Sequence, residues 1–71
     1  MSIDGKYGFW DRLREAMTAN RIKVTQKNAG ALAGVNQTSA RKWQYGELPS
    51  MTNALQIGQA TGYCVEWLLT G

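Results

Sequence analysis

Hydrophobic positions near the start of the chain recur at the spacing of an α-helix. Phe9, Leu13 and Met17 are each four residues apart, and Arg12, Arg14 and Glu15 occupy the faces between them. This period predicts an amphipathic helix over residues 8–20, with the apolar residues turned toward a core. Residues 1–8 include two glycines and show no periodicity. We therefore predict a flexible arm over 1–8 and a folded domain over 9–71.

Capping residues and glycines divide the middle of the chain into two short helices. Thr25 and Asn36 have side chains that accept hydrogen bonds from the free N–H groups of a first helical turn. Gly34 and Gly46 follow at positions suited to ending a helix, because glycine readily adopts the left-handed conformation of a C′ residue. The predicted helices cover residues 26–33 and 37–45, after a connector at 21–24.

The same signals predict two more helices toward the C-terminus. Pro49 disfavours helix at the residue before it, Ser50 is a good N-cap, and Gly62 is a good terminator. The predicted helices cover residues 51–61 and 65–69. In the first of them, the inward-facing residues are expected to be Met51, Ala54, Leu55 and Gly58. Five helices joined by short connections predict a compact all-α domain.

Small residues in the segment 25–43 indicate a specific motif within this helical domain. Ala29 and Gly30 permit close approach of two helices, and Gly34 permits a tight turn between them. Val35, Ala40 and Trp43 are expected to anchor the second helix in the core. This arrangement is typical of a helix-turn-helix, which places its second helix in a DNA major groove.

The distribution of charge agrees with a polyanionic partner. The chain of 71 residues has a net charge of +3, and no acidic residue lies between Ala16 and Gly46. The basic residues of that stretch are Arg21, Lys23, Lys27, Arg41 and Lys42. Such a surface suits nucleic acid, whereas a merely soluble surface mixes both signs.

The motif predicts which side chains meet DNA. Glutamine pairs with adenine, arginine or lysine pairs with guanine, and a threonine methyl contacts a thymine methyl. The expected base-reading residues are Gln37, Thr38, Arg41 and Lys42. Phosphates are expected at the positive end of the first motif helix and on the opposite flank of the groove. The expected phosphate-binding residues are Thr25, Gln26, Lys27, Asn36, Tyr45 and Gly46.

Other kinds of function have little support. The chain has no histidine and a single cysteine, Cys64, so we expect no disulfide, no structural zinc site and a cytoplasmic location. No catalytic constellation or phosphate loop is visible, so we expect no enzyme activity, cofactor or small-molecule substrate. No apolar run approaches the ~20 residues of a membrane span. Cys64 is expected to be a small buried residue, with a redox-active thiol as the alternative.

Large apolar residues are adjacent in the sequence near both ends of the predicted domain. Phe9 and Trp10 are neighbours in the sequence, so one of the two rings should be half exposed. Trp67, Leu68 and Leu69 follow one another on the last helix and cannot all face one way. We expect the exposed apolar surface there to form a dimer interface, with ordinary core packing as the alternative.

The region from Trp10 to Gly71 resembles the lambda-repressor-like, Cro/repressor (Xre-type) DNA-binding domains. The resemblance is carried by Thr25-Gln26, Gly34-Val35, Trp43 with Gly46, Pro49-Ser50 and the closing Glu66-Trp67-Leu68-Leu69-Thr70-Gly71. It implies a phosphate-clamping role for Gln26, which in that family can brace the first base-reading glutamine, here Gln37. It also implies a dimer formed partly through the last helix.

Several positions depart from the family pattern. Ala40 stands in place of a branched aliphatic residue and Thr61 in place of leucine, which predicts a looser core. Gln44 replaces a common glutamate, and Cys64 replaces a capping serine or aspartate. We expect a sequence-specific regulator of the phage or prophage repressor type, acting as a homodimer on a pseudo-palindromic operator in double-stranded DNA. The alternative is a helix-turn-helix that binds protein, as an antitoxin-like or antirepressor module.

Overall fold

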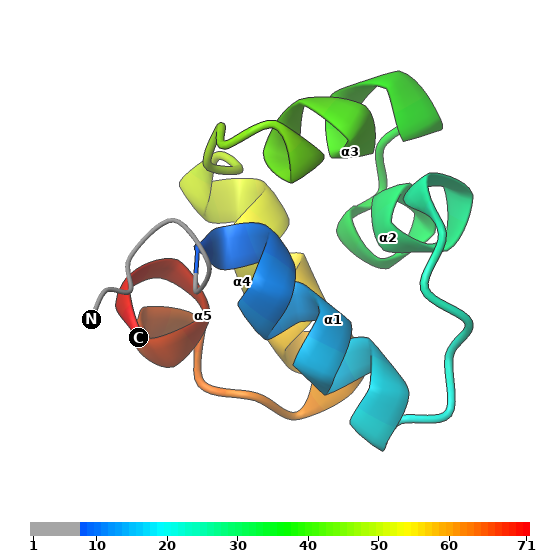
Figure 1. Ribbon diagram of the computed structural model, residues 1–71. Helices are drawn as coiled ribbons and strands as arrows, with labels where there is room; N and C mark the ends of the chain where they lie inside the picture. The colour runs from blue at the N-terminus through cyan, green and yellow to red at the C-terminus, as the bar shows by residue number, and fades with distance from the viewer. Residues whose placement is uncertain (1–7) are drawn as a thin grey trace.

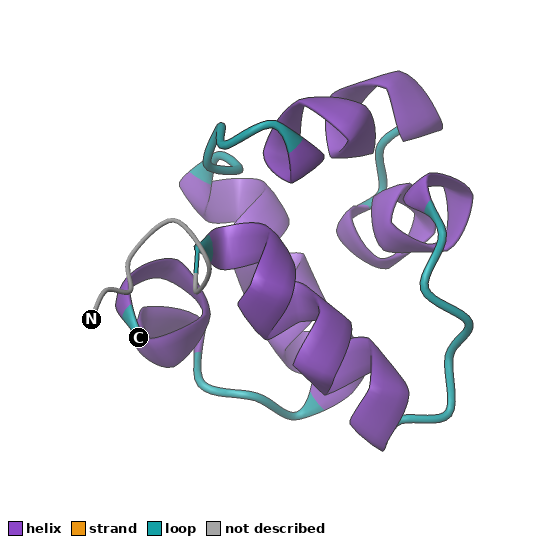
Figure 2. Cartoon of the chain, in the orientation of Figure 1, coloured by secondary structure: helices purple, strands orange, loops and turns teal. Residues whose placement is uncertain are grey.

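Five helices make up residues 8–71, the part of the chain that the computed structural model describes, and this part contains no strand (Figures 1 and 2). They are α1 (Phe9–Ala19), α2 (Gln26–Ala33), α3 (Gln37–Gln44), α4 (Met51–Thr61) and α5 (Val65–Thr70). The predicted all-α class is confirmed, and the predicted helix ends are correct to within a residue. The arm predicted over residues 1–8 lies outside the described residues, except for Gly8, which is the N-cap of α1.

Three of the helices begin at the side-chain caps that the sequence predicts. Thr25 Oγ1 accepts a hydrogen bond from the Asn28 amide at 3.0 Å. Asn36 Oδ1 accepts from Ser39 N at 3.1 Å, and Ser50 Oγ accepts from Asn53 N at 3.2 Å. Each bond satisfies one of the amides that a helix start leaves without an intrahelical partner. The caps therefore fix where α2, α3 and α4 start.

Two glycines with different roles permit the tight turn between α2 and α3. Gly34 caps α2 in the left-handed conformation, with φ of 75°. Gly30 lies inside α2, where a Cβ atom would come within 2.8 Å of the carbonyl oxygens of Val35 and Asn36. Since those oxygens belong to the backbone, the turn can pass this close only over a residue without a side chain.

The core lies between the helices, and all five of them contribute buried side chains to it (Figure 1). Its large side chains include Leu13, Met17, Ile57 and Leu68, which are fully buried. The rings of Phe9 and Trp43 meet edge to face, with their centroids 5.7 Å apart, a favourable geometry for aromatic pairs. Trp43 is therefore a core residue, as predicted. Of the adjacent N-terminal rings, Phe9 is buried and Trp10 is half-buried, also as predicted.

The predicted inward face of α4 is wrong at two of its four positions. Ala54 and Gly58 are buried, but Met51 is 61% exposed and Leu55 is 48% exposed. The buried stripe continues instead through Ile57 and Thr61, at the i, i+3, i+4, i+7 spacing of one helix face. The position of α4 between α2 and α5 buries Ile57 and Thr61 in place of Met51 and Leu55.

Thr61 satisfies its polar group inside the protein. Its hydroxyl donates to the Ile57 carbonyl at 2.8 Å and accepts from the Tyr63 amide at 3.3 Å. The side chain is only 6% exposed, so without these bonds the hydroxyl would be costly to bury. Threonine at this position therefore shapes the turn between α4 and α5 as well as filling space.

Two polar side chains of α1 and its C-cap tie distant segments together. Arg12 donates from Nε to the Leu68 carbonyl at 2.9 Å and from Nη2 to the Leu69 carbonyl at 3.0 Å. Asn20 Nδ2 donates to the Ala16 carbonyl and to the Thr61 carbonyl, at 2.8 and 2.9 Å. The helical period predicts only that Arg12 lies off the apolar face of α1. Its guanidinium satisfies carbonyls in the last turn of α5, where the helix dipole favours a cation.

Candidate nucleic-acid interface

The outer face of α3 carries all four of the predicted base-reading residues. Ala40 and Trp43 turn the opposite face into the core. The exposed side chains are Gln37, Thr38, Arg41 and Lys42. They occupy positions i, i+1, i+4 and i+5, which adjoin one another on a helix surface. We call this set the α3 face.

One member of the α3 face has an aromatic partner. The guanidinium carbon of Arg41 lies 5.8 Å from the centroid of the Tyr45 ring, a cation–π contact. Tyr45 is 75% exposed and forms the C-cap of α3, so it lies just past the end of the helix. The contact therefore holds the Arg41 guanidinium near the C-terminal end of the α3 face.

The start of α2 lies next to the end of α3. Gln26 Nε2 donates to Gln44 Oε1 at 2.6 Å, across the pair of helices. The resemblance implied that Gln26 braces Gln37, but the partner in the structure is Gln44. The sequence does not reveal this pair, since it depends on the crossing of α2 and α3. Gln44 is thus a residue of the site that sequence reasoning missed.

The remaining predicted phosphate ligands divide between the two helix starts and the end of α3. Thr25 and Asn36 use side-chain oxygens as caps, so each has its backbone at a helix N-terminus. Lys27 is exposed in the first turn of α2. Gly46 is exposed, with φ of 108°, after the C-cap of α3. Helix starts attract anions through free N–H groups and the positive end of the dipole.

The described acidic residues all lie outside α2 and α3. They are Asp11 and Glu15 on α1, Glu47 after α3, and Glu66 on α5. The charged residues of α2 and α3 are Lys27, Arg41 and Lys42. The two helices therefore present positive charge alone, as the sequence predicts.

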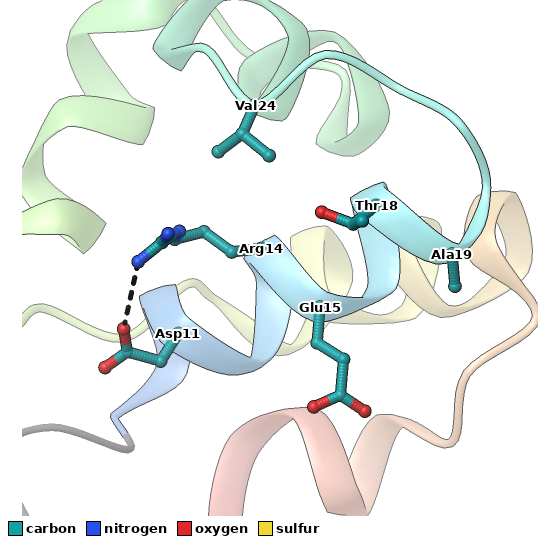
Figure 3. A pocket seen from close by; sticks show the side chains of 6 residues that line it. All are labelled: Asp11, Arg14, Glu15, Thr18, Ala19 and Val24. Carbon is teal, nitrogen blue, oxygen red and sulfur yellow. Dashed lines mark ion pairs between the residues drawn. The ribbon is translucent and has the colours of Figure 1, made fainter.

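A shallow groove runs along α1 beneath the connector before α2 (Figure 3). Its lining residues are Asp11, Arg14, Glu15, Thr18, Ala19 and Val24. Arg14 is paired within α1, where Nη1 lies 3.6 Å from Asp11 Oδ1. The groove thus has two acids beside one cation, and it belongs to a different helix from the α3 face. Its charge does not suit a polyanion.

The dimer surface predicted on α5 is wrong in part. Leu68 is fully buried and belongs to the core of the chain itself, so its side chain has no surface to offer a partner. Trp67 and Leu69 are half-buried, and Trp67 packs against Tyr63 with ring centroids 5.3 Å apart. A short helix docked on α1 and α4 turns its middle residue inward and leaves the flanking pair at the edge.

Cys64 is exposed rather than buried, which contradicts the predicted small core residue. It is the N-cap of α5, and its side chain makes no capping hydrogen bond. Among residues 8–71, no three His, Cys, Asp or Glu side chains are grouped closely enough to hold a metal ion. In the same range, every helix is too short or too polar to cross a membrane.

No protein-family model matches this chain, and comparisons with curated proteins and with solved structures also find no match. The functional argument therefore depends on the geometry and charge of the described residues.

Proposed function

We propose that the chain is a lambda-repressor-like helix-turn-helix domain that binds double-stranded DNA in a sequence-specific manner. In this proposal α2 and α3 form the motif, and α3 enters the major groove. The observation that carries it is the exposed α3 face, which is free of acidic residues and belongs to a helix whose last residue lies beside the start of α2. A groove about 12 Å wide admits one helix carrying such side chains.

The order of residues along α3 suits base reading. Gln37 and Thr38 lie in its first turn, the part that reaches base edges in the usual docking. Glutamine offers a donor and an acceptor to adenine, and Arg41 offers a two-pronged donor to guanine. Gly30 lets the turn lie against α2, which fixes the start of α3 relative to α2, and Gln37 and Thr38 are exposed there. This arrangement leaves the reading residues free to enter a groove.

Phosphate contacts would orient this helix. Gln26 and Lys27 stand at the positive end of α2, and Gln44 holds the Gln26 side chain there. Tyr45 and Gly46 follow Gln44 at the end of α3 and would meet the backbone beside Gln26, and Asn36 would meet it at the start of α3. Such contacts supply affinity and register without reading sequence. Their position at both ends of α3 suits a helix that lies in one major groove between two phosphate backbones.

The biological role that follows is transcriptional regulation, most simply repression of the phage or prophage type. A single module of this size makes few base contacts, so specificity requires two copies on a pseudo-palindromic operator. Their recognition helices would be about 34 Å apart, one turn of the duplex. Occupancy of the operator would exclude polymerase.

Selection of bound DNA from a random duplex pool tests this proposal. We expect enrichment of a motif with two-fold symmetry, its half-sites centred about 10 bp apart. A matched selection with the Arg41→Ala, Lys42→Ala double variant should lose the DNA motif, because two of the proposed base contacts are removed. Both side chains are exposed, so the variant should still fold. Failure of the folded wild-type protein to enrich any sequence would overturn the proposal.

A further inference from the structure

Tyr45 is an exposed aromatic residue on an anchored part of the chain. It is 75% exposed and forms the C-cap of α3. The Tyr45 amide donates to the Lys42 carbonyl at 3.1 Å, and the Gly46 amide donates to the Trp43 carbonyl at 3.1 Å. Trp43 is buried in the core. The ring therefore projects from an end of α3 that the core holds in place.

The ring of Tyr45 contacts a residue that we assign to base reading. The guanidinium carbon of Arg41 lies 5.8 Å from the ring centroid, within the ~6 Å range of a cation–π contact. Arg41 also lies in the last turn of α3, where the helix dipole favours a cation. Both effects keep the guanidinium beside Tyr45.

The long side chain of Arg41 has a second neighbour on the opposite side. Residues four apart adjoin on a helix surface, so Arg41 lies between Gln37 and Tyr45. Side chains of a helix lean toward its N-terminus. An arginine without an aromatic partner would therefore also sample positions over Gln37, where the two side chains would compete for one base pair.

We propose that Tyr45 is a positioning residue that determines which base pair Arg41 reads, and this inference rests on the proposed DNA-binding function. The ring contacts the guanidinium, while the N–H donors in the guanidinium plane stay available to O6 and N7 of a guanine. Four residues separate Gln37 from Arg41, which is about 6 Å along the helix. Successive base pairs are only ~3.4 Å apart, so the two side chains can read different base pairs.

This role differs from the phosphate contact that we also assign to Tyr45. A phosphate contact would use the hydroxyl and would carry no sequence information. Positioning of Arg41 uses the ring and changes the preference at one base pair. Tyr45→Phe, which keeps the ring and removes the hydroxyl, separates the two roles.

Binding to single-base variants of a selected duplex tests the inference. Arg41→Ala identifies the base pair that Arg41 reads. Tyr45→Leu should reduce the preference at that base pair by about twofold to fivefold, the equivalent of an exposed cation–π contact, and leave the preference at other base pairs unchanged. Tyr45→Phe should keep the wild-type preference. In the Arg41→Ala background, Tyr45→Leu should have no further effect on preference, because its partner is already absent.

Aromatic ring currents report the same contact without DNA. The side-chain proton resonances of Arg41 should be shifted upfield in the wild-type protein and in Tyr45→Phe. In Tyr45→Leu they should return toward the positions of an arginine without an aromatic neighbour. Identical Arg41 resonances in all three proteins would overturn the inference, whatever the protein does with DNA.

The outcomes on DNA separate this inference from the proposed function. An unchanged base preference in Tyr45→Leu would overturn the inference while leaving DNA binding intact. An equal loss of preference in Tyr45→Phe would also overturn it, because the hydroxyl would then be responsible. Failure of the folded wild-type protein to select any duplex would overturn the proposed function and, with it, the role of Tyr45 in base reading.

Discussion

The side chain of Gln26 donates a hydrogen bond of 2.6 Å to the side chain of Gln44, joining the first residue of α2 to the last residue of α3. Both helices are eight residues long. This exposed bond therefore joins the two outermost residues of the helix pair, which are 18 positions apart in the sequence. If Gln26 contacts a phosphate, as we propose, Gln44 holds the Gln26 side chain in one conformation before DNA binds. This reduces the side-chain entropy that is lost on binding.

Gln44→Ala should therefore weaken DNA binding by about threefold, the equivalent of one modest hydrogen bond, and change the free energy of unfolding by less than about 0.5 kcal/mol. Titration of a selected duplex measures the effect. In a double-mutant cycle with Gln26→Ala, the two losses should not add. Gln59→Ala, an exposed glutamine of α4, serves as the control. Additive losses would show that Gln44 does not act through Gln26.

Gln37 and Gln26 should differ in what their removal does to specificity. Gln37→Ala should relax the preference at one base pair by about 1–3 kcal/mol, because a bidentate base contact is lost. Gln26→Ala should weaken binding to all sequences alike, because a phosphate contact carries no sequence information. Binding measured on single-base variants of the selected site distinguishes the two. Equal loss of preference from both variants would contradict the docking that we propose.

The salt dependence of binding should identify which cations meet phosphate. Lys27→Gln should reduce the slope of log affinity against log salt by about 0.9, the value for one released counterion per contact. Arg14→Gln removes the same charge from the α1 groove, beside Asp11, and should leave the slope unchanged. Measurements across ~50–200 mM salt check both expectations. Equal changes in slope would mean that net charge, rather than position, governs affinity.

The sequence predicted the parts of this fold that local chemistry determines. Thr25, Asn36 and Ser50 each cap their own helix, and a cap requires only the few residues that follow it. The α3 face was found for a similar reason. Burial of Ala40 and Trp43 sets the orientation of that helix, so the outward residues follow from its period.

Contacts that depend on how helices cross were not predicted. The Gln26–Gln44 bond and the Arg12 bonds to the α5 carbonyls link residues 18, 56 and 57 positions apart. Hydrophobicity also misassigned Met51 and Leu55 to the core. The helical period shows which residues share a face, but the neighbouring helices determine which face is buried. The same limit applied to Leu68, whose burial depends on the docking of α5.

At Gly30, the steric cost of adding a side chain should exceed the gain in helix propensity from alanine. Alanine in a helix interior is favoured over glycine by about 1 kcal/mol, but the added methyl would lie 2.8 Å from two backbone oxygens. We expect Gly30→Ala to lower the free energy of unfolding by about 2 kcal/mol, since overpacking costs more than the propensity gain. Ala31→Gly, at the next, exposed position, calibrates propensity and should cost about 1 kcal/mol. Stabilisation by Gly30→Ala in urea denaturation would disprove the close approach.

The bonds from Arg12 to the Leu68 and Leu69 carbonyls should make this residue a main support of α5. Arg12→Met keeps the apolar stem but removes the donors, and hydrogen bonds from a charged group contribute about 1.5–3 kcal/mol. A domain of this length has only about 4–10 kcal/mol of total stability, so the loss would be a large fraction. Urea denaturation followed by tryptophan fluorescence measures it, since Trp67 lies in α5. Arg14→Met, which breaks only an ion pair within α1, should cost less than about 0.5 kcal/mol. If the two variants were equally stable, the carbonyl bonds of Arg12 would contribute nothing to the docking of α5.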